Sequence, residues 1–144
     1  MLATVDYRVE YRAQTVVEVQ AAKDALRKHA ITTIGLPKDN EPLFVSAMTD
    51  DRLIGNATGK FSWNWLYIDL LWVGEAFRKR GVGRELMRLA EAEARAKKVT
   101  GIYLWTQSWQ APGFYTKLGY EQFVELKDFP PGHTRIGFCK YLKA

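Results

Sequence analysis

The residues with the clearest chemical potential lie in the stretch FRKRGVGRELM, which runs from Phe77 to Met87. Its cations and glycines are Arg78, Lys79, Arg80, Gly81, Gly83 and Arg84. A glycine-rich turn in front of a helix presents backbone N–H groups that have no partner inside the helix, and these groups can bind an anion. The stretch therefore predicts either an anion site or an ordinary basic entry into a helix.

The glycine spacing excludes two nucleotide-binding motifs. It matches neither G-x-x-x-x-G-K-S/T nor G-x-G-x-x-G, because Leu86 stands where the third glycine of the second motif would be. The chain has 144 residues and a formal charge of +5 at pH 7, which favours an anionic ligand. Charge alone leaves nucleic acid, phospholipid and a phosphorylated small molecule as alternatives.

Disulfide and metal chemistry are not expected. Cys139 is the only cysteine and the two histidines lie far apart, so the sequence holds neither a disulfide pair nor a cluster of metal ligands. No run approaches the roughly 18 apolar residues that a membrane helix needs, and the N-terminus lacks the residue order of a signal peptide. We therefore expect a cytoplasmic protein without a metal site or a membrane contact.

The elements that must position the basic stretch follow from the sequence pattern. A chain of this length can form one domain, so we expect a single domain over residues 1–144. Alternation in DYRVEYR predicts a strand over about Tyr7 to Tyr11, and Thr15 with Glu18 matches a capping box that begins a helix ending near His29. GLPKDNEP then predicts a loop, and LFVSAM and RLIGNATGKFSW predict a hairpin.

A β-α-β unit is predicted in the middle of the chain. The nearly continuous apolar run WLYIDLLWV, from Trp65 to Val73, predicts a strand covered on both faces. Helical spacing of apolar residues follows from about Gly83 to Lys97, and GIYLWT predicts a second, parallel strand. APGFYTKLG predicts a short helix, and YEQFVEL and RIGFCKYL predict two last strands.

Two of these segments resemble motifs of the GNAT superfamily of N-acyltransferases. R-x-x-G-x-G, from Arg78 to Gly83 directly after LLWV, is similar to the acyl-CoA signature of that superfamily. TQSWQAPGFYTKLGYEQF, from Thr106 to Phe123, resembles its later motif. The resemblance implies an α/β fold with a mixed, mostly antiparallel sheet, a central parallel pair of strands that splay apart, and helices on both faces.

The resemblance also implies where the acyl donor, acetyl-CoA, would bind. Its pantetheine arm would pair with backbone groups of the strand end Leu71, Trp72 and Val73. Its pyrophosphate would lie on the N–H groups of the basic stretch, including Val82, with the four cations as counter-charges. Ser108 stands where the family often has asparagine, so a side-chain amide contact would be lost or replaced by a hydroxyl.

Catalytic roles follow for two residues. Tyr115 matches the family position that often protonates the departing thiolate, and a tyrosine with an ordinary pKa of about 10 can donate a proton at neutral pH. The alternative is that Phe114 and Tyr115 only pack their helix on the sheet. Asp69 is the only acidic residue inside the buried-looking strand, so it is a candidate base or a salt-bridged structural residue. Glu75 and His133 are weaker candidates, since loop residues of these types are more often solvated.

The sequence therefore predicts an N-acetyltransferase that moves an acetyl group from acetyl-CoA to a primary amine by direct attack in a ternary complex. The backbone N–H of Val73 would stabilise the oxyanion. The acceptor is a small molecule or a peptide, and a homodimer is possible. Two alternatives are a basic nucleic-acid-binding module, which the second motif disfavours, and an acyl-CoA sensor that binds without transfer.

Overall fold

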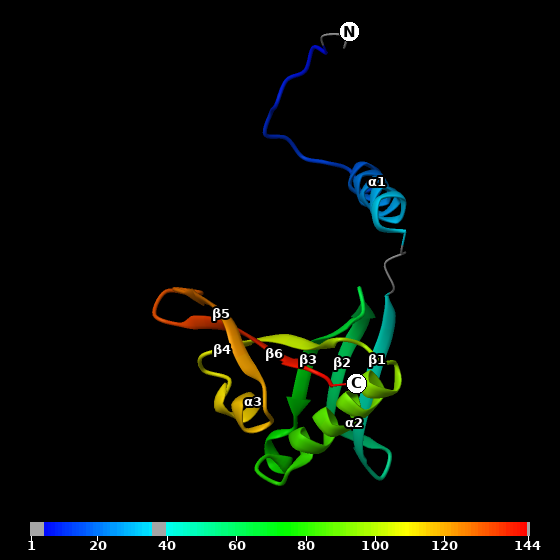
Figure 1. Cartoon of the computed structure of the whole chain (residues 1–144). Helices are drawn as coiled ribbons and strands as arrows, with labels where there is room; N and C mark the ends of the chain where they lie inside the picture. The colour runs from blue at the N-terminus through cyan, green and yellow to red at the C-terminus, as the bar shows by residue number, and fades with distance from the viewer. Residues whose placement is uncertain (1–4, 36–39, 144) are drawn as a thin grey trace. The chain divides into compact units, whose positions relative to one another are not determined.

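The structure is a computed structural model that describes residues 5–35 and 40–143. By its internal contacts the chain divides into two units, Met1–Lys38 and Asp39–Ala144. The first unit holds the helix α1 and the second holds the sheet, as Figure 1 shows.

Helix α1 of the first unit spans Val16–Ile34. The predicted capping box is present: Thr15 Oγ1 accepts a hydrogen bond from the Glu18 N–H at 3.1 Å, and the Glu18 carboxylate accepts one from the Thr15 N–H at 2.9 Å. The helix ends at Gly35, whose φ of 73° is left-handed and whose N–H donates to the carbonyl of Ile31. The predicted helix is therefore confirmed, and it extends past His29 until a glycine can adopt the terminating conformation.

The predicted strand over Tyr7 to Tyr11 is wrong. Residues 5–15 contain no strand. An alternating segment forms a strand only when a neighbouring strand takes its backbone hydrogen bonds, and the described sheet contains only strands that begin at Glu41 or later. The predicted loop GLPKDNEP lies partly outside the described residues, and its last two residues already belong to the first strand of the sheet.

The second unit contains a six-stranded sheet in the order β1-β2-β3-β4-β6-β5. Its elements are β1 (Glu41–Thr49), β2 (Arg52–Ser62), β3 (Trp65–Val73), α2 (Val82–Ala96), β4 (Gly101–Gln107), α3 (Gly113–Lys117), β5 (Glu121–Lys127) and β6 (Thr134–Tyr141). Only β3 and β4 pair in parallel, and the other neighbours are antiparallel. The predicted mixed, mostly antiparallel α/β fold is confirmed.

Helix α2 connects the two parallel strands and supplies one side of the core. Its apolar positions recur at helical spacing and are buried against the sheet: Leu86, Met87, Ala90 and Ala94. The sheet contributes the buried residues Leu66, Ile68, Ile102, Leu104 and Phe138. In Figure 1 the helix runs across the strands β1 to β3. This packing fixes the start of α2, and with it the basic stretch, relative to the end of β3.

Within residues 40–143, strand β3 is buried only on the face toward α2. Leu66 and Ile68 are buried, whereas Leu70 and Trp72 are 47% and 42% exposed. The apolar run includes large side chains that line the face opposite α2. Within residues 40–143 no helix covers that face, and helix cover there stays a prediction because α1 belongs to the other unit.

Candidate functional site

The parallel strands part in the middle of the sheet. Their pairing runs from Trp65–Gly101 to Ile68–Leu104 and then stops, although β3 continues to Val73 and β4 to Gln107. At the same point β3 holds one extra residue, because Ile68 pairs with Gly59 of β2 and Leu70 pairs with Thr58. Asp69 is therefore a β-bulge, and a bulge bends its strand. The bend opens a gap between the two strand ends.

The backbone at the end of β3 faces this gap. The Gly74 N–H donates to the carbonyl of Ile54 at 2.7 Å, and hydrogen-bonded pairs alternate along antiparallel strands. The backbone N–H and C=O groups of Trp72 therefore point toward β2, whereas those of Leu71 and Val73 point away from β2, toward the gap. Of the three residues expected to bind a pantetheine arm, Leu71 has both backbone groups available for it and Val73 has its N–H.

The loop after β3 places a row of N–H groups beside the gap. A single turn of 3-10 helix, η1 (Glu75–Phe77), leads into it, and the Arg78 Nε donates to the Val73 carbonyl at 3.0 Å. Lys79 and Gly81 then adopt left-handed φ values of 62° and 81°. Among the described residues, no group accepts a hydrogen bond from the backbone N–H of residues 79–84. These donors are oriented at the start of α2, where the helix dipole adds positive potential.

The two glycines of the loop have different structural roles. A Cβ at Gly81 would meet nothing within 4 Å, so this position needs glycine for its positive φ and leaves open space above the backbone. A Cβ at Gly83 would lie 3.3 Å from the Phe114 ring and 3.7 Å from Val73. Gly83 therefore allows α3 to approach α2, which brings the helix that carries Tyr115 close to the loop.

The cations Arg78, Lys79, Arg80 and Arg84 are all exposed. No carboxylate in the described parts of the chain pairs with any of them, and Arg78 is tied to the Val73 carbonyl. Four cations without a carboxylate partner, beside six N–H groups without acceptors among the described residues, form a site suited to a multiply charged anion.

Tyr115 is buried on the α2 side of the sheet, and its ring packs on Phe138 with centroids 5.8 Å apart. Burial raises the pKa of its phenol to about 12. Within residues 40–143 no group forms a hydrogen bond with its hydroxyl. The tyrosine therefore keeps its proton at neutral pH and has no internal acceptor for it.

A polar cluster holds α3 in place. The Tyr120 hydroxyl donates to Glu91 Oε1 at 2.9 Å, and Lys140 Nζ donates to the same carboxylate at 3.1 Å and to the Leu118 carbonyl at 2.9 Å. Burial, followed by the charge of Glu91, raises the pKa of Tyr120. The cluster joins α2, α3 and β6, and its bond from Lys140 to the Leu118 carbonyl holds the end of the helix that carries Tyr115.

Asp69 lies at the bulge, and its carboxylate is exposed rather than buried, contrary to the prediction from the apolar run. The Thr58 hydroxyl donates to Asp69 Oδ1 at 2.5 Å, which orients the carboxylate and leaves its second oxygen available. No cation forms a salt bridge with it among the described residues, which disfavours the structural alternative.

The remaining candidates have other contacts. The Ser108 hydroxyl accepts the Thr134 N–H at 3.0 Å, which fastens the end of β4 to β6. His133 is exposed and meets the Trp109 ring edge-on, with centroids 5.0 Å apart. Glu75 is exposed at the first position of η1. No group of three or more metal-ligating side chains occurs among the residues that the structure describes.

Sequence reasoning assigned no role to Arg135, which lies on β6 near the gap. Its guanidinium carbon is 4.8 Å from the centroid of the Trp105 ring and 5.2 Å from that of Phe129. Trp105 is distant from Arg135 in sequence, and only the pairing of β4 with β6 brings the two residues together. No sequence motif marks this arrangement.

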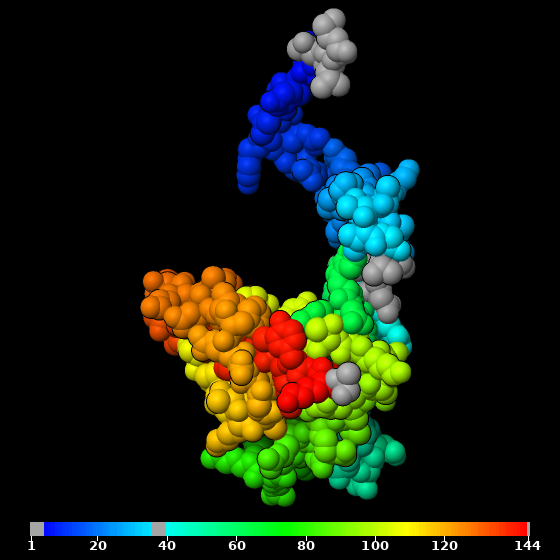
Figure 2. All heavy atoms as spheres, in the orientation of Figure 1, coloured from blue at the N-terminus to red at the C-terminus, as the bar shows by residue number. Residues whose placement is uncertain are grey.

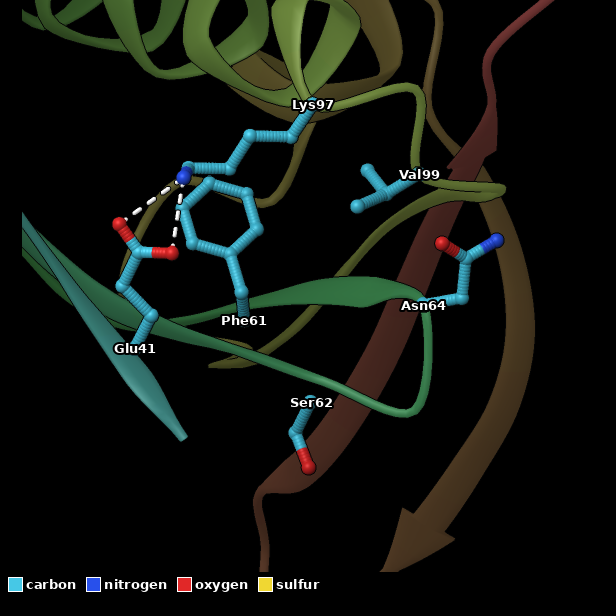
Figure 3. Close-up of a pocket in the computed structure, with 6 residues that line it drawn as sticks. All are labelled: Glu41, Phe61, Ser62, Asn64, Lys97 and Val99. Atoms are coloured by element: carbon cyan, nitrogen blue, oxygen red, sulfur yellow. Dashed lines mark hydrogen bonds and ion pairs between the residues drawn. The ribbon is translucent and has the colours of Figure 1, made fainter. Parts of the chain in front are cut away.

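A separate pocket lies at the opposite end of the parallel pair, where β3 and β4 begin (Figure 3). Its lining residues are Glu41, Phe61, Ser62, Asn64, Lys97 and Val99. Lys97 Nζ, 5.2 Å from the Phe61 ring centroid, donates to both oxygens of Glu41 at 2.8 and 2.9 Å. This ion pair fastens the end of α2 to β1, so we assign the pocket a structural role.

The chain is similar to known acetyltransferases. The family model described as "Acetyltransferase (GNAT) family" matches residues 6–120. Blasticidin-S acetyltransferase of Streptomyces morookaense is 42% identical over 84 residues, which cover 58% of this chain and 62% of that relative. The aligned part therefore spans less than two thirds of the relative.

Solved structures have the same fold. An acetyltransferase from Bacillus cereus ATCC 14579 matches with a TM-score of 0.86 and 29% identity, over 93% of this chain and 98% of that one. A candidate streptothricin acetyltransferase from Bacillus anthracis, solved in complex with acetyl coenzyme A, matches with a TM-score of 0.64 and 24% identity, over 71% and 63% of the chains. No described helix is long and apolar enough to cross a membrane.

Proposed function

The chain belongs to the GNAT family of acetyltransferases, and on this basis we propose that it transfers an acetyl group from acetyl-CoA to a primary amine by direct attack in a ternary complex. One observation carries the proposal: the gap that begins at Asp69 opens beside the N–H groups of residues 79–84, for which no acceptor is described. An extended arm fits the gap and a pyrophosphate fits the N–H groups.

The residues present suit acetyl-CoA. The N–H and C=O groups of Leu71 can pair with the amides of the pantetheine arm, as a sheet edge pairs with an added strand, and the Val73 N–H stays available for the thioester. The backbone N–H groups of the loop, Val82 included, can bind the pyrophosphate, and Gly81 leaves space above them. The exposed cations add counter-charge. Ser108, whose hydroxyl is occupied by Thr134, would act only by fastening the strand end.

The transfer step uses three groups of the chain. Asp69 accepts a proton from the attacking amine, directly or through water, as the C–N bond forms. The Val73 N–H donates a hydrogen bond to the thioester oxygen as it gains negative charge. Tyr115 then donates its proton to the departing thiolate as the C–S bond breaks. Arg78 holds the Val73 carbonyl and so orients this strand end.

The acceptor is proposed as a small-molecule amine rather than a peptide. The relatives named for blasticidin S and streptothricin support this choice. The cytoplasmic location and a homodimer stay predictions from the sequence.

Two measurements test the proposal. Calorimetry should show that acetyl-CoA binds, and a thiol-release assay over a panel of primary amines should show release that depends on the amine. Absence of acetyl-CoA binding at high micromolar concentration would contradict the proposal. Binding without amine-dependent release would indicate a sensor, and salt-sensitive binding of nucleic acid in place of acetyl-CoA would indicate a nucleic-acid-binding module.

A further inference from the structure

The face of the sheet opposite α2 holds an aromatic wall, which we define as Tyr67, Tyr103, Trp105, Phe123 and Phe129. Tyr67 and Tyr103 stack with ring centroids 4.8 Å apart, and Trp105 meets Phe123 at 6.0 Å. Within residues 40–143 no helix covers this face. The wall therefore lies beside the gap and on the side away from Tyr115.

Asp69 and Trp105 are the first residues after the parallel pairing stops. Ile68 and Leu104 form the last pair and both point into the core, so the next residue of each strand points to the opposite face. Asp69 and Trp105 therefore flank the mouth of the gap on the face of the aromatic wall. An amine that reaches a thioester in the gap from this face passes between a carboxylate and an indole ring.

Arg135 is a half-buried cation on the same face. It lies over the Trp105 and Phe129 rings, and no carboxylate in residues 40–143 forms a salt bridge with it. The aromatic rings contact the flat faces of the guanidinium, so the N–H groups along its edge stay available to donate hydrogen bonds. A partly desolvated guanidinium without an anion is unfavourable, so its edge is suited to an oxyanion from a ligand.

Two neighbours of Arg135 fit a binding role. Gln107 pairs with Arg135 across β4 and β6, and its Oε1 is buried without a hydrogen-bond donor among the described residues. Gly137 pairs with Trp105, and a Cβ there would lie 2.9 Å from the Phe123 ring, so glycine allows that ring to lie close to the sheet. The β5–β6 hairpin that carries Arg135 stands out from the rest of the second unit in Figure 2.

We propose that the acceptor is an amine that also carries an oxyanionic group, a carboxylate or a phosphate, and that Arg135 binds this group while Asp69 receives the amine. The inference rests on the proposed acetyl transfer. Asp69 lies on β3 and Arg135 on β6, with β4 between them and the gap beside it, so the two groups of the acceptor are separated by more than two strand spacings, that is by more than about 10 Å. An α-amino acid is too short to satisfy both residues.

A matched set of probes tests the proposal. The acceptors are ω-aminooctanoate, ω-aminooctylphosphonate and the uncharged ω-aminooctanamide, each assayed by thiol release with saturating acetyl-CoA. We expect kcat/KM for at least one acid to exceed that for the amide roughly 10- to 100-fold, as a charge-assisted pair would give. The better of the two acids identifies the oxyanion.

Variants separate a binding role from a packing role. Arg135→Gln should remove most of the preference by raising KM for the acid far more than KM for the amide, and Arg135→Lys should keep part of the preference. Lys127→Gln is the matched control, because it removes a positive charge from the same hairpin at an exposed position. It should keep the full preference.

Failure of the Arg135 inference can be told apart from failure of the proposed function, because acetyl-CoA binding is measured separately by calorimetry. Loss of that binding would contradict the proposed function. If acetyl-CoA binds, then equal use of acid and amide, or no use of either acid, would overturn the inference. An Arg135→Gln variant that loses acid and amide activity equally would also overturn it, because Arg135 would then be a packing residue.

Discussion

Two tyrosines of the second unit have hydroxyl groups in opposite situations. The Tyr120 hydroxyl is fixed by Glu91, whereas the Tyr115 hydroxyl has no partner among residues 40–143. The rings are neighbours, with centroids 6.1 Å apart and nearly perpendicular planes. Their similar burial and different bonding make them a natural pair for separating catalysis from stability.

We predict that Tyr115→Phe lowers kcat about 100- to 10,000-fold, because the departing thiolate loses its proton donor. The Kd for acetyl-CoA should not change, since the ring and its contact with Phe138 remain. Steady-state kinetics and calorimetry on the same preparation measure both quantities. Tyr120→Phe is the control, and it should lose about 1 kcal/mol of stability with little change in kcat. Equal turnover of Tyr115→Phe and the wild type would remove Tyr115 from the mechanism.

The raised pKa of Tyr115 also predicts how stability depends on pH. The phenol ionises near pH 10 in the unfolded chain and near 12 in the folded protein. The folded state therefore favours the protonated form, and its contribution to stability is complete below about pH 10 and is lost as the pH rises through about 12. Tyrosinate absorbance and circular dichroism, recorded together in an alkaline titration, should show ionisation of the last tyrosines coinciding with unfolding. Ionisation of all tyrosines near pH 10 in a folded protein would contradict this.

At the scale of elements, the loop between β3 and α2 depends on the backbone conformation of Gly81. Gly81→Ala has space for its Cβ but must adopt a φ of 81°, at an expected cost of about 1 kcal/mol. We predict that the variant folds and that its affinity for acetyl-CoA falls about tenfold, because the new methyl group occupies space above the phosphate-binding N–H groups.

Gly132→Ala provides a matched control for the Gly81 variant. Gly132 has a φ of 85° and also meets nothing within 4 Å, but it lies in the turn between β5 and β6. The two variants should lose similar stability in thermal unfolding, and only Gly81→Ala should lose affinity in calorimetry. A Gly81→Ala protein that binds acetyl-CoA as tightly as the Gly132 control would show that the loop does not hold the phosphates.

Elements with strong local patterns could be predicted from the sequence, and pairing between elements could not. The predicted helices at Thr15 and Gly83 begin within a residue of the observed ones, because capping residues and apolar spacing are local signals. The strand predicted over Tyr7 to Tyr11 failed because its alternation does not show whether a partner strand exists. The exposure of Leu70 likewise depends on which sheet face α2 covers.

The candidate site divides in the same way. The basic loop and Tyr115 lie in sequence motifs, so they could be predicted as candidate site residues from the sequence. The bulge that exposes Asp69 is visible only in the register between β2 and β3, and Arg135 comes beside Trp105 only through the register between β4 and β6. Both features depend on pairing between strands that are distant in sequence, and the spacing of residues within one segment does not predict such pairing.

At the scale of the whole molecule, the formal charge of +5 should act on the binding of the acyl donor. Because the loop cations are exposed, salt should screen them. We predict that raising NaCl from about 50 to about 200 mM weakens acetyl-CoA binding several-fold, whereas binding of acetyl-pantetheine, which lacks the phosphates, changes little. Calorimetry at three salt concentrations measures both. Equal salt dependence for the two ligands would place the phosphates away from the cations.

The β-bulge at Asp69 depends on a single extra residue in β3. Without that one residue, Ile68 and Leu70 would be consecutive, and they already pair with the consecutive residues Gly59 and Thr58. Every other pair between β2 and β3 would stay in register, every core side chain would keep its face, and the straightened β3 could continue to pair with β4. A single-codon deletion would thus remove the cofactor gap and the candidate base together while leaving the fold intact.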